Sequence, residues 1–115
     1  MAALNVYQPS EAGTAPTPTA FTATDTIPVG ASGFYYLIAR NTTASQLTIK
    51  IDDPTTPQPG GAAAIDPDQT VIVPITTGER VIKLDPRRVR DVNGNINLAN
   101  TNPAAGTTGY VIGPF

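Results

Sequence analysis

Prolines and glycines interrupt this chain so often that only short regular elements fit between them. The 115 residues include 12 prolines and 10 glycines. Proline removes a backbone donor, and glycine costs conformational entropy inside a helix or strand. The intervening segments are rich in threonine, valine, isoleucine and tyrosine, which favour strands, and turn signals recur roughly every ten residues. The sequence therefore predicts an all-β fold, either a β-sandwich or a jelly-roll-like barrel of six to eight short antiparallel strands.

The length predicts one domain with a single core. We expect residues 21–115 to form that β-sandwich domain and residues 1–20, which are rich in proline and threonine, to form an extended N-terminal arm. Three prolines in the arm favour a polyproline-like path and exclude it from a central strand. Near its tip, Leu4, Val6 and Tyr7 are predicted to be apolar anchors for a protein contact.

Residues 33–51 carry the strongest strand pattern, and we interpret them as a central β-hairpin. The run Phe34–Ala39 is continuously apolar, as expected of a strand buried on both faces. Leu47, Ile49 and Ile51 alternate with polar residues, which predicts a strand with one exposed face. The link, residues 41–45, has short polar side chains that favour a reversal. Its Asn-Thr-Thr also fits the N-glycosylation pattern, which we interpret as turn chemistry.

Further signals follow this hairpin. Residues 52–68 form a long loop with four prolines, of a kind that is usually functional or mobile. Residues 69–75 and 79–84 are predicted to pair as a second hairpin. Asp85 is predicted to cap one helical turn that extends to Asp91, because proline follows it at the first helical position. Asn93-Gly94 predicts a two-residue hairpin turn between Val92 and a strand at residues 95–98, and residues 107–112 are predicted to be the last strand.

The sequence holds no motif for catalysis, for a cofactor or for a metal. It contains neither cysteine nor histidine, which excludes thiolate metal sites and the commonest general base. Four acidic residues around the long loop have the oxygen ligands that Ca²⁺ prefers, but their spacing fits no calcium loop, and we expect a solvated acidic loop instead: Asp52, Asp53, Asp66 and Asp68. We expect no enzymatic activity, no cofactor and no metal.

The charge distribution predicts a protein contact. The net charge is −2, yet five of the seven basic residues lie within residues 80–90: Arg80, Lys83, Arg87, Arg88 and Arg90. No aromatic residue lies between them, so the stacking platform that single-stranded nucleic acid needs is missing, and we expect no nucleic-acid partner. A plain solvated face is the alternative. No long apolar run or secretory signal is present, so we expect no membrane association and no export.

Three segments resemble one family. Residues 40–51, 77–82 and 89–98 have an order of strands and turns similar to that of small head proteins of tailed bacteriophages, and the resemblance spans about residues 30–112. It implies a capsid decoration, or cement, protein: a β-sandwich that binds the outside of an icosahedral shell, commonly as a homotrimer, and stabilises that shell. Its partner would be the major capsid protein, and its location the virion, assembled in the host cytoplasm.

Two alternatives remain open. One is a carbohydrate-binding or adhesin-like module, because such modules share the sandwich architecture. The other is a tail or connector component of a phage.

Overall fold

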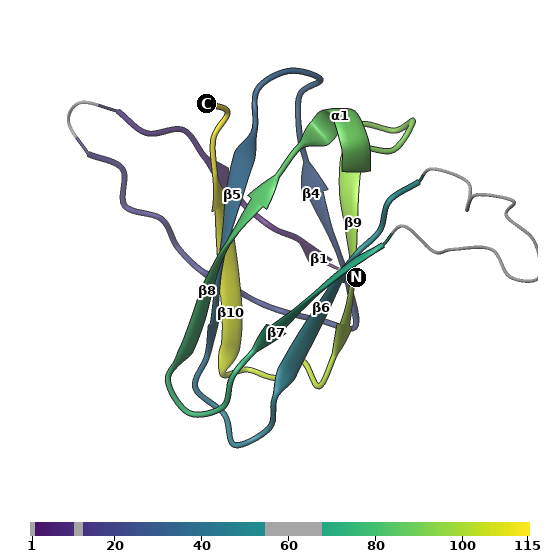
Figure 1. Cartoon of the computed structure of the whole chain (residues 1–115). Coiled ribbons are helices and arrows are strands. Elements are labelled where there is room, and N and C mark those ends of the chain that lie inside the picture. The colour runs from purple at the N-terminus through teal and green to yellow at the C-terminus, as the bar shows by residue number, and fades with distance from the viewer. Residues whose placement is uncertain (1, 11–12, 55–67) are drawn as a thin grey trace, which may run out of the picture.

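The computed structural model describes residues 2–10, 13–54 and 68–115. Short strands and one four-residue helix form this part of the chain (Figure 1). In chain order the elements are β1 (Ala2–Ala3), β2 (Val6–Tyr7), β3 (Thr19–Ala20), β4 (Thr24–Pro28), β5 (Tyr35–Asn41), β6 (Leu47–Ile51), β7 (Gln69–Val73), β8 (Gly78–Leu84), α1 (Pro86–Val89), β9 (Asn95–Thr101) and β10 (Thr107–Ile112).

The strands form two stacked sheets, which confirms the predicted β-sandwich. Sheet A has the order β1-β4-β9-β6-β7, and sheet B has the order β2-β10-β5-β8, with β3 pairing beside β2 on β10. Most neighbours are antiparallel, but β1 lies parallel to β4 and β2 lies parallel to β10. The sheets do not close into a barrel, so the jelly-roll-like barrel is not the architecture.

Apolar side chains from both sheets meet between them and make one core. Along β6, Leu47, Ile49 and Ile51 are almost fully buried, while Thr48 and Lys50 point outward, as the alternation predicted. The buried apolar residues are Leu4, Phe21, Ile27, Tyr35, Leu37, Ala39, Leu47, Ile49, Ile51, Val73, Ile82, Leu84, Val89, Ile96, Leu98 and Val111.

The prediction of a separate N-terminal arm was wrong. β1 pairs with sheet A and β2 with sheet B, so the chain crosses from one sheet to the other within a few residues. Leu4 lies at this crossing with 1% of its surface exposed, and its backbone N–H donates to the carbonyl of Thr26 at 2.8 Å. The prolines keep this segment out of the central strands, but they do not prevent two-residue pairings at the sheet margins.

The central hairpin was also predicted wrongly. β5 lies in sheet B between β10 and β8, whereas β6 lies in sheet A between β9 and β7. Residues 42–46 therefore connect the two sheets instead of two neighbouring strands. The physical reason is burial: the apolar sides of β5 and β6 both face the core, and they cover each other only when the strands lie in opposite sheets.

Asn41 organises this connection from a fully buried position. Its Oδ1 accepts hydrogen bonds from the backbone N–H and the hydroxyl of Thr43, at 2.9 and 2.7 Å. Its Nδ2 donates to the carbonyls of Ser45 and Val73. This confirms the predicted turn chemistry. Because Asn41 is completely buried, its amide is closed to glycosylation in the folded chain.

The remaining sequence signals have mixed outcomes. β7 and β8 do not form a hairpin, because their connecting turn also crosses between sheets. The helical turn is confirmed: Asp85 Oδ1 accepts from the N–H of Arg87 at 3.1 Å, and α1 follows. Gly94, with φ of 84°, lies in a turn before β9, but Arg90 and not Val92 pairs across that turn, through an antiparallel bridge to Ile96. The last strand is confirmed at Thr107–Ile112. Most of the long loop, residues 55–67 with Asp66, lies outside the described residues.

Candidate functional site: an exposed aromatic face

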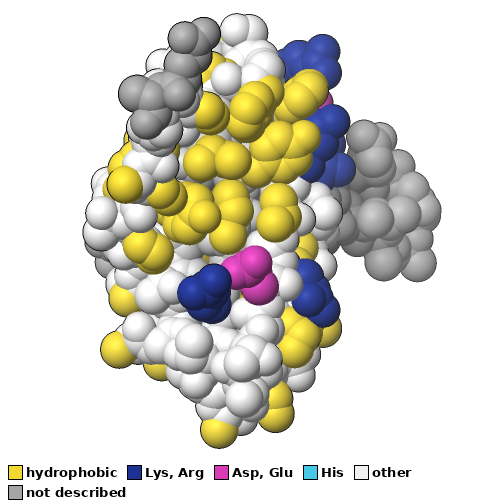
Figure 2. All heavy atoms as spheres, turned by 90° about the vertical axis from the view of Figure 1, so that its left-hand side faces the viewer, with side chains coloured by type: hydrophobic (Ala, Val, Ile, Leu, Met, Phe, Trp, Pro, Cys, Tyr) yellow, Lys and Arg dark blue, Asp and Glu magenta, His cyan; other side chains and the backbone are white. Residues whose placement is uncertain are grey.

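The outer face of sheet B carries most of the aromatic residues of the chain. Five of the seven aromatic side chains lie there, half-buried or exposed, and only Phe21 and Tyr35 lie in the core. Figure 2 shows hydrophobic side chains gathered over this side of the molecule. We call this surface the aromatic face and define it by Tyr7, Phe34, Tyr36, Ile38, Val81, Tyr110, Ile112 and Phe115.

The strand period produces this face. In β5, Tyr35, Leu37 and Ala39 are buried, whereas Tyr36 and Ile38 point outward. The prediction that this run is buried on both faces was therefore wrong, because no described element covers the outer side of sheet B. The sequence did contain a signal of this exposure. Arg40 follows Tyr36 and Ile38 at the same two-residue spacing, and a charged residue on that side of the strand indicates contact with solvent.

The rings on the aromatic face pack edge to face. Tyr36 lies between two neighbours, with its ring centroid 6.4 Å from that of Phe34 and 5.4 Å from that of Phe115. Tyr7 and Tyr110 form a separate pair at 6.4 Å with an interplanar angle of 78°. Such contacts fix the rings and lower the entropy that they would lose on binding a partner. The face is therefore a preorganised apolar surface.

Few charges border the face. The guanidinium of Arg40 and the carboxylate of Glu79 form an ion pair at 2.9 Å, so these two charges compensate each other. The ammonium of Lys83 lies 4.1 Å from the centroid of the Phe34 ring, a cation–π contact. A surface of this composition, apolar at its centre and polar at its rim, is typical of a protein interface.

The segment that follows β2 borders the face on one side. The Tyr7 hydroxyl accepts a hydrogen bond from the N–H of Thr17 at 3.1 Å, and this bond lowers the pKa of Tyr7. Two open hollows of about 340 and 200 Å³ lie here and share Pro16, Ile38 and Tyr110 as lining residues. The face is thus grooved where this segment lies beside β5 and β10.

The three predicted apolar anchors have different places. Leu4 is a core residue, and Val6 is partly buried against the same core. Tyr7 belongs to the aromatic face. Of these three residues, only Tyr7 presents its side chain to a partner.

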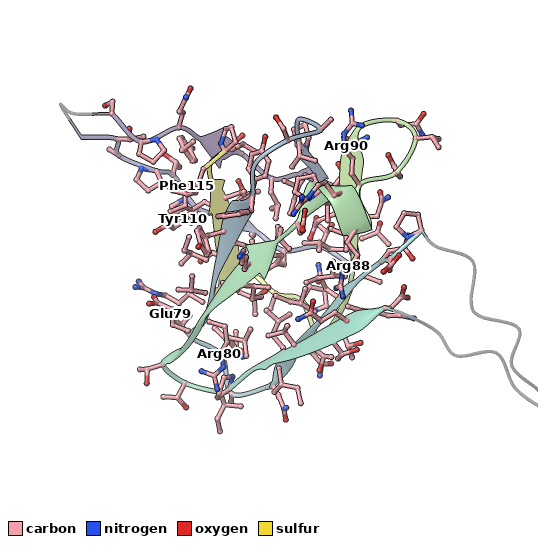
Figure 3. All side chains as sticks on the ribbon, turned by 45° about the horizontal axis from the view of Figure 1, so that its top comes forward. Glu79, Arg80, Arg88, Arg90, Tyr110 and Phe115 are labelled. Carbon is pink, nitrogen blue, oxygen red and sulfur yellow. The ribbon has the colours of Figure 1, made fainter. Side chains whose placement is uncertain are left out.

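The basic residues of the predicted contact are separated in space (Figure 3). Arg80 donates to the carbonyl of Glu79, its own neighbour, near the connection between β7 and β8. Arg88 and Arg90 lie at the other end of the molecule, beside α1. Sequence proximity overstated this cluster, because β8 is extended and carries its ends far apart.

The arginines around α1 have local partners. Arg87 pairs with Asp85 at 3.2 Å, and its hydrogen bond lowers the pKa of Asp85 while Asp85 raises the pKa of Arg87. Arg88 donates to the Gln69 side chain at 3.0 Å and lies 3.9 Å from the carboxylate of Asp53. Such bonds tie α1 to the margin of sheet A.

Arg90 is tied to the same end of the sandwich. Its Nε donates to the carbonyl of Val29 at 3.3 Å, which links the end of α1 to the loop after β4.

A third hollow, of about 370 Å³, lies on the outer face of sheet A. Its lining includes Thr24, Thr26, Asn97 and the ion pair of Lys50 with Asp68 at 3.1 Å. Among the described residues, no acidic side chains gather in a group suited to a metal ion. Nor is any helix in that part of the chain long and apolar enough to cross a membrane.

The fold and this surface together define a class: a β-sandwich whose second sheet presents a preorganised aromatic face. No protein-family model matches the chain, and neither the curated proteins nor the solved structures include one with significant similarity to it.

Proposed function

We propose that this chain is a non-enzymatic virion structural protein that binds the exterior of a phage capsid through the aromatic face and stabilises the shell. The observation that carries the proposal is the aromatic face itself. A surface that exposes five aromatic rings together with Ile38, Val81 and Ile112 is unfavourable in water unless a partner covers it. The resemblance of residues 30–112 to small phage head proteins makes the major capsid protein the partner that we propose.

The mechanism of stabilisation is mass action. A sandwich that binds only the assembled shell lowers the free energy of that assembled state, and each bound copy adds contact area that must be broken before the shell opens. The edge-to-face rings suit this role, because a rigid surface loses little conformational entropy on binding. The copies also associate with one another in this proposal. The resemblance implies a homotrimer, and a measurement of the oligomeric state distinguishes it from the two-fold contact argued below.

Binding to shells prepared without this chain tests the proposal. The variants Tyr36→Ser and Tyr110→Ser each remove one ring from the centre of the face, and Thr48→Ala on the outer face of sheet A is the matched control. We expect each tyrosine variant to weaken shell binding by about tenfold or more, as central aromatic residues do at interfaces. The control is expected to bind like the unchanged protein, and to raise the temperature at which shells open.

Equal binding of the shell by all three variants would show that the aromatic face does not contact the shell. Failure of the unchanged protein to bind any shell, while it remains folded, would contradict the capsid function itself.

A carbohydrate-binding module is the second candidate. Such modules bind sugars with exposed aromatic side chains, and five aromatic side chains lie on the aromatic face of this protein. The edge-to-face packing counts against it, since Phe34, Tyr36 and Phe115 cover part of each other's faces and leave no coplanar platform for a sugar ring. Retention of the protein on insoluble polysaccharides, lost in Tyr36→Ser, would favour this alternative over shell binding.

A further inference from the structure

β8 is a long open edge of sheet B. Its seven residues pair with β5 in one continuous register without a bulge, and β8 contains no proline. No described strand lies on its other side, and Figure 1 shows it along the outside of the sandwich. The opposite margin of sheet B is formed by strands of only two residues, β2 and β3. A long regular edge is a template for pairing with another chain, and the charges of Glu79, Arg80 and Lys83 restrict which chain can pair with it.

The hydrogen-bond pattern shows which backbone groups point out of this edge. The N–H of Thr42 donates to the carbonyl of Gly106, in register with the pairs of β5 and β10. Along an antiparallel strand, the backbone N–H and C=O groups of successive residues point alternately to the two neighbouring strands. The backbone groups of even-numbered residues in β5 therefore bond to β10, and those of odd-numbered residues bond to β8. The register pairs Leu37 with Ile82, so the even-numbered residues of β8 bond inward. The N–H and C=O groups of Glu79, Val81 and Lys83 therefore face the open edge.

The side chains of these three residues match a second copy of the same strand. They share the outer face of the sheet, and Val81, in the middle, has 64% of its surface exposed. An antiparallel partner centred on Val81 places Val81 against its counterpart, and Glu79 of each copy opposite Lys83 of the other. Registers centred on Glu79 or on Lys83 would instead place like charges opposite each other, which is unfavourable.

We propose that β8 pairs with β8 of a second copy around a two-fold axis at Val81. Both hydrogen bonds from Arg40 go to Oε2 of Glu79, which leaves Oε1 for the ammonium of Lys83 from the other copy. Arg80 must move aside, because its guanidinium donates to the carbonyl of Glu79 at 2.8 Å. The contact closes with two copies, whereas a homotrimer needs a different, head-to-tail contact.

This pairing has a consequence for the aromatic face. Edge pairing makes sheet B continuous across the two copies and doubles the aromatic face. The dimer does not depend on the capsid function, which is tested separately.

Charge exchange tests the register of the contact. Sedimentation equilibrium of the full chain is measured for the unchanged protein, for Glu79→Lys, for Lys83→Glu and for the double variant. Each single variant places like charges opposite each other twice in the dimer, and we expect it to raise the dimer dissociation constant by about tenfold. The double variant restores opposite charges and is expected to return to within about threefold of the unchanged protein.

Val81→Pro tests the edge itself. The N–H of Val81 points away from β5, so proline at this position removes a donor to the second copy and none within the sheet. We expect a folded monomer with an unchanged β-sheet circular dichroism spectrum. If the variant fails to fold, the charge series decides alone.

Three results would overturn the two-fold contact: a monomer at high micromolar concentration, a trimer, or a dimer that is indifferent to both single charge variants. Shell binding by Glu79→Lys at a concentration where this variant is monomeric would separate the dimer from the proposed capsid function.

Discussion

Asn100 of β9 donates a hydrogen bond from Nδ2 to Oδ2 of Asp25 in β4 at 2.7 Å, and both side chains are buried. The backbone N–H and the hydroxyl of Thr22 also donate to the Asp25 carboxylate, at 3.0 and 2.6 Å. These donors hold the buried carboxylate in place. Asn100 Oδ1 has no hydrogen-bond partner in the described part of the chain. The pair fixes the margin of sheet A, where β4 receives the N-terminal segment.

Replacing Asp25 by alanine should leave buried hydrogen-bond donors without an acceptor. One N–H of the Asn100 amide and the backbone N–H of Thr22 lose their acceptor, whereas the Thr22 hydroxyl keeps the carbonyl of Thr24 at 2.8 Å. We expect the free energy of unfolding to fall by about 2 kcal/mol. Urea denaturation measures the change. Thr24→Ala, one residue away and exposed, is the control and should stay within about 0.5 kcal/mol of the unchanged protein.

Leu4 should behave as a core residue. Because it is 1% exposed between the sheets, Leu4→Ala is expected to lower the free energy of unfolding by about 2–5 kcal/mol. Gln8→Ala, exposed in the same segment, is the control. A chain that begins at Phe21 loses β1, β2 and β3 together with Leu4, and we expect it to unfold or to melt far lower, by circular dichroism. Unaltered melting of that truncated chain would contradict the pairings described for residues 2–20.

The two sides of β6 should respond differently to truncation. Ile49 is fully buried, and Ile49→Ala should cost on the order of 2–5 kcal/mol in the free energy of unfolding. Thr48 points outward, and Thr48→Ala should change stability little. A denaturant titration that gave equal effects at the two positions would show that the faces of β6 are assigned wrongly.

Asp91 should contribute to stability above acidic pH. Its carboxylate accepts from the Asn97 side chain at 2.8 Å and from the N–H groups of Asn95 and Asn93, and these bonds lower the pKa of Asp91. As the pH falls, the Asp91 carboxylate therefore becomes protonated at a higher pH in the unfolded chain than in the folded chain. Stability from this group is complete above the ordinary aspartate pKa of about 3.9 and is lost as the pH falls below it.

Melting curves measured in acid check this expectation. Asp91→Asn removes the titration and retains an acceptor oxygen, so we expect its melting temperature to fall less than that of the unchanged protein across this acidic range. Parallel curves for the two proteins would exclude Asp91 as a source of acid sensitivity.

Local patterns in the sequence predicted the elements well. The alternation of β6 identified its buried side, Asp85 before proline predicted the cap of α1, and Asn93-Gly94 predicted the turn before β9. Each of these features depends on residues within a few positions of one another. The strand-rich composition likewise predicted the sandwich class.

Pairing between strands was not predictable in the same way. The link at residues 41–45 favours a reversal of the chain, but a reversal serves equally well between neighbouring strands of one sheet and between two sheets. The choice between a hairpin and a connection between sheets depends on what covers the apolar side of β6. Sheet B covers that side, so the chain passes from one sheet to the other. The short N-terminal strands were missed because two-residue pairings carry little periodic signal, and the burial of Leu4 depends on both sheets at once.

By itself, the sequence determined the all-β class, the places where the chain turns and the inward side of β6, because backbone preferences and side-chain alternation act locally. Only the tertiary structure decided that Phe34 and Phe115, far apart in the chain, lie on one surface with Tyr36. It also decided that β8 ends sheet B with an open edge. Both features arise from strand order, which is set by the burial of one shared core between distant segments.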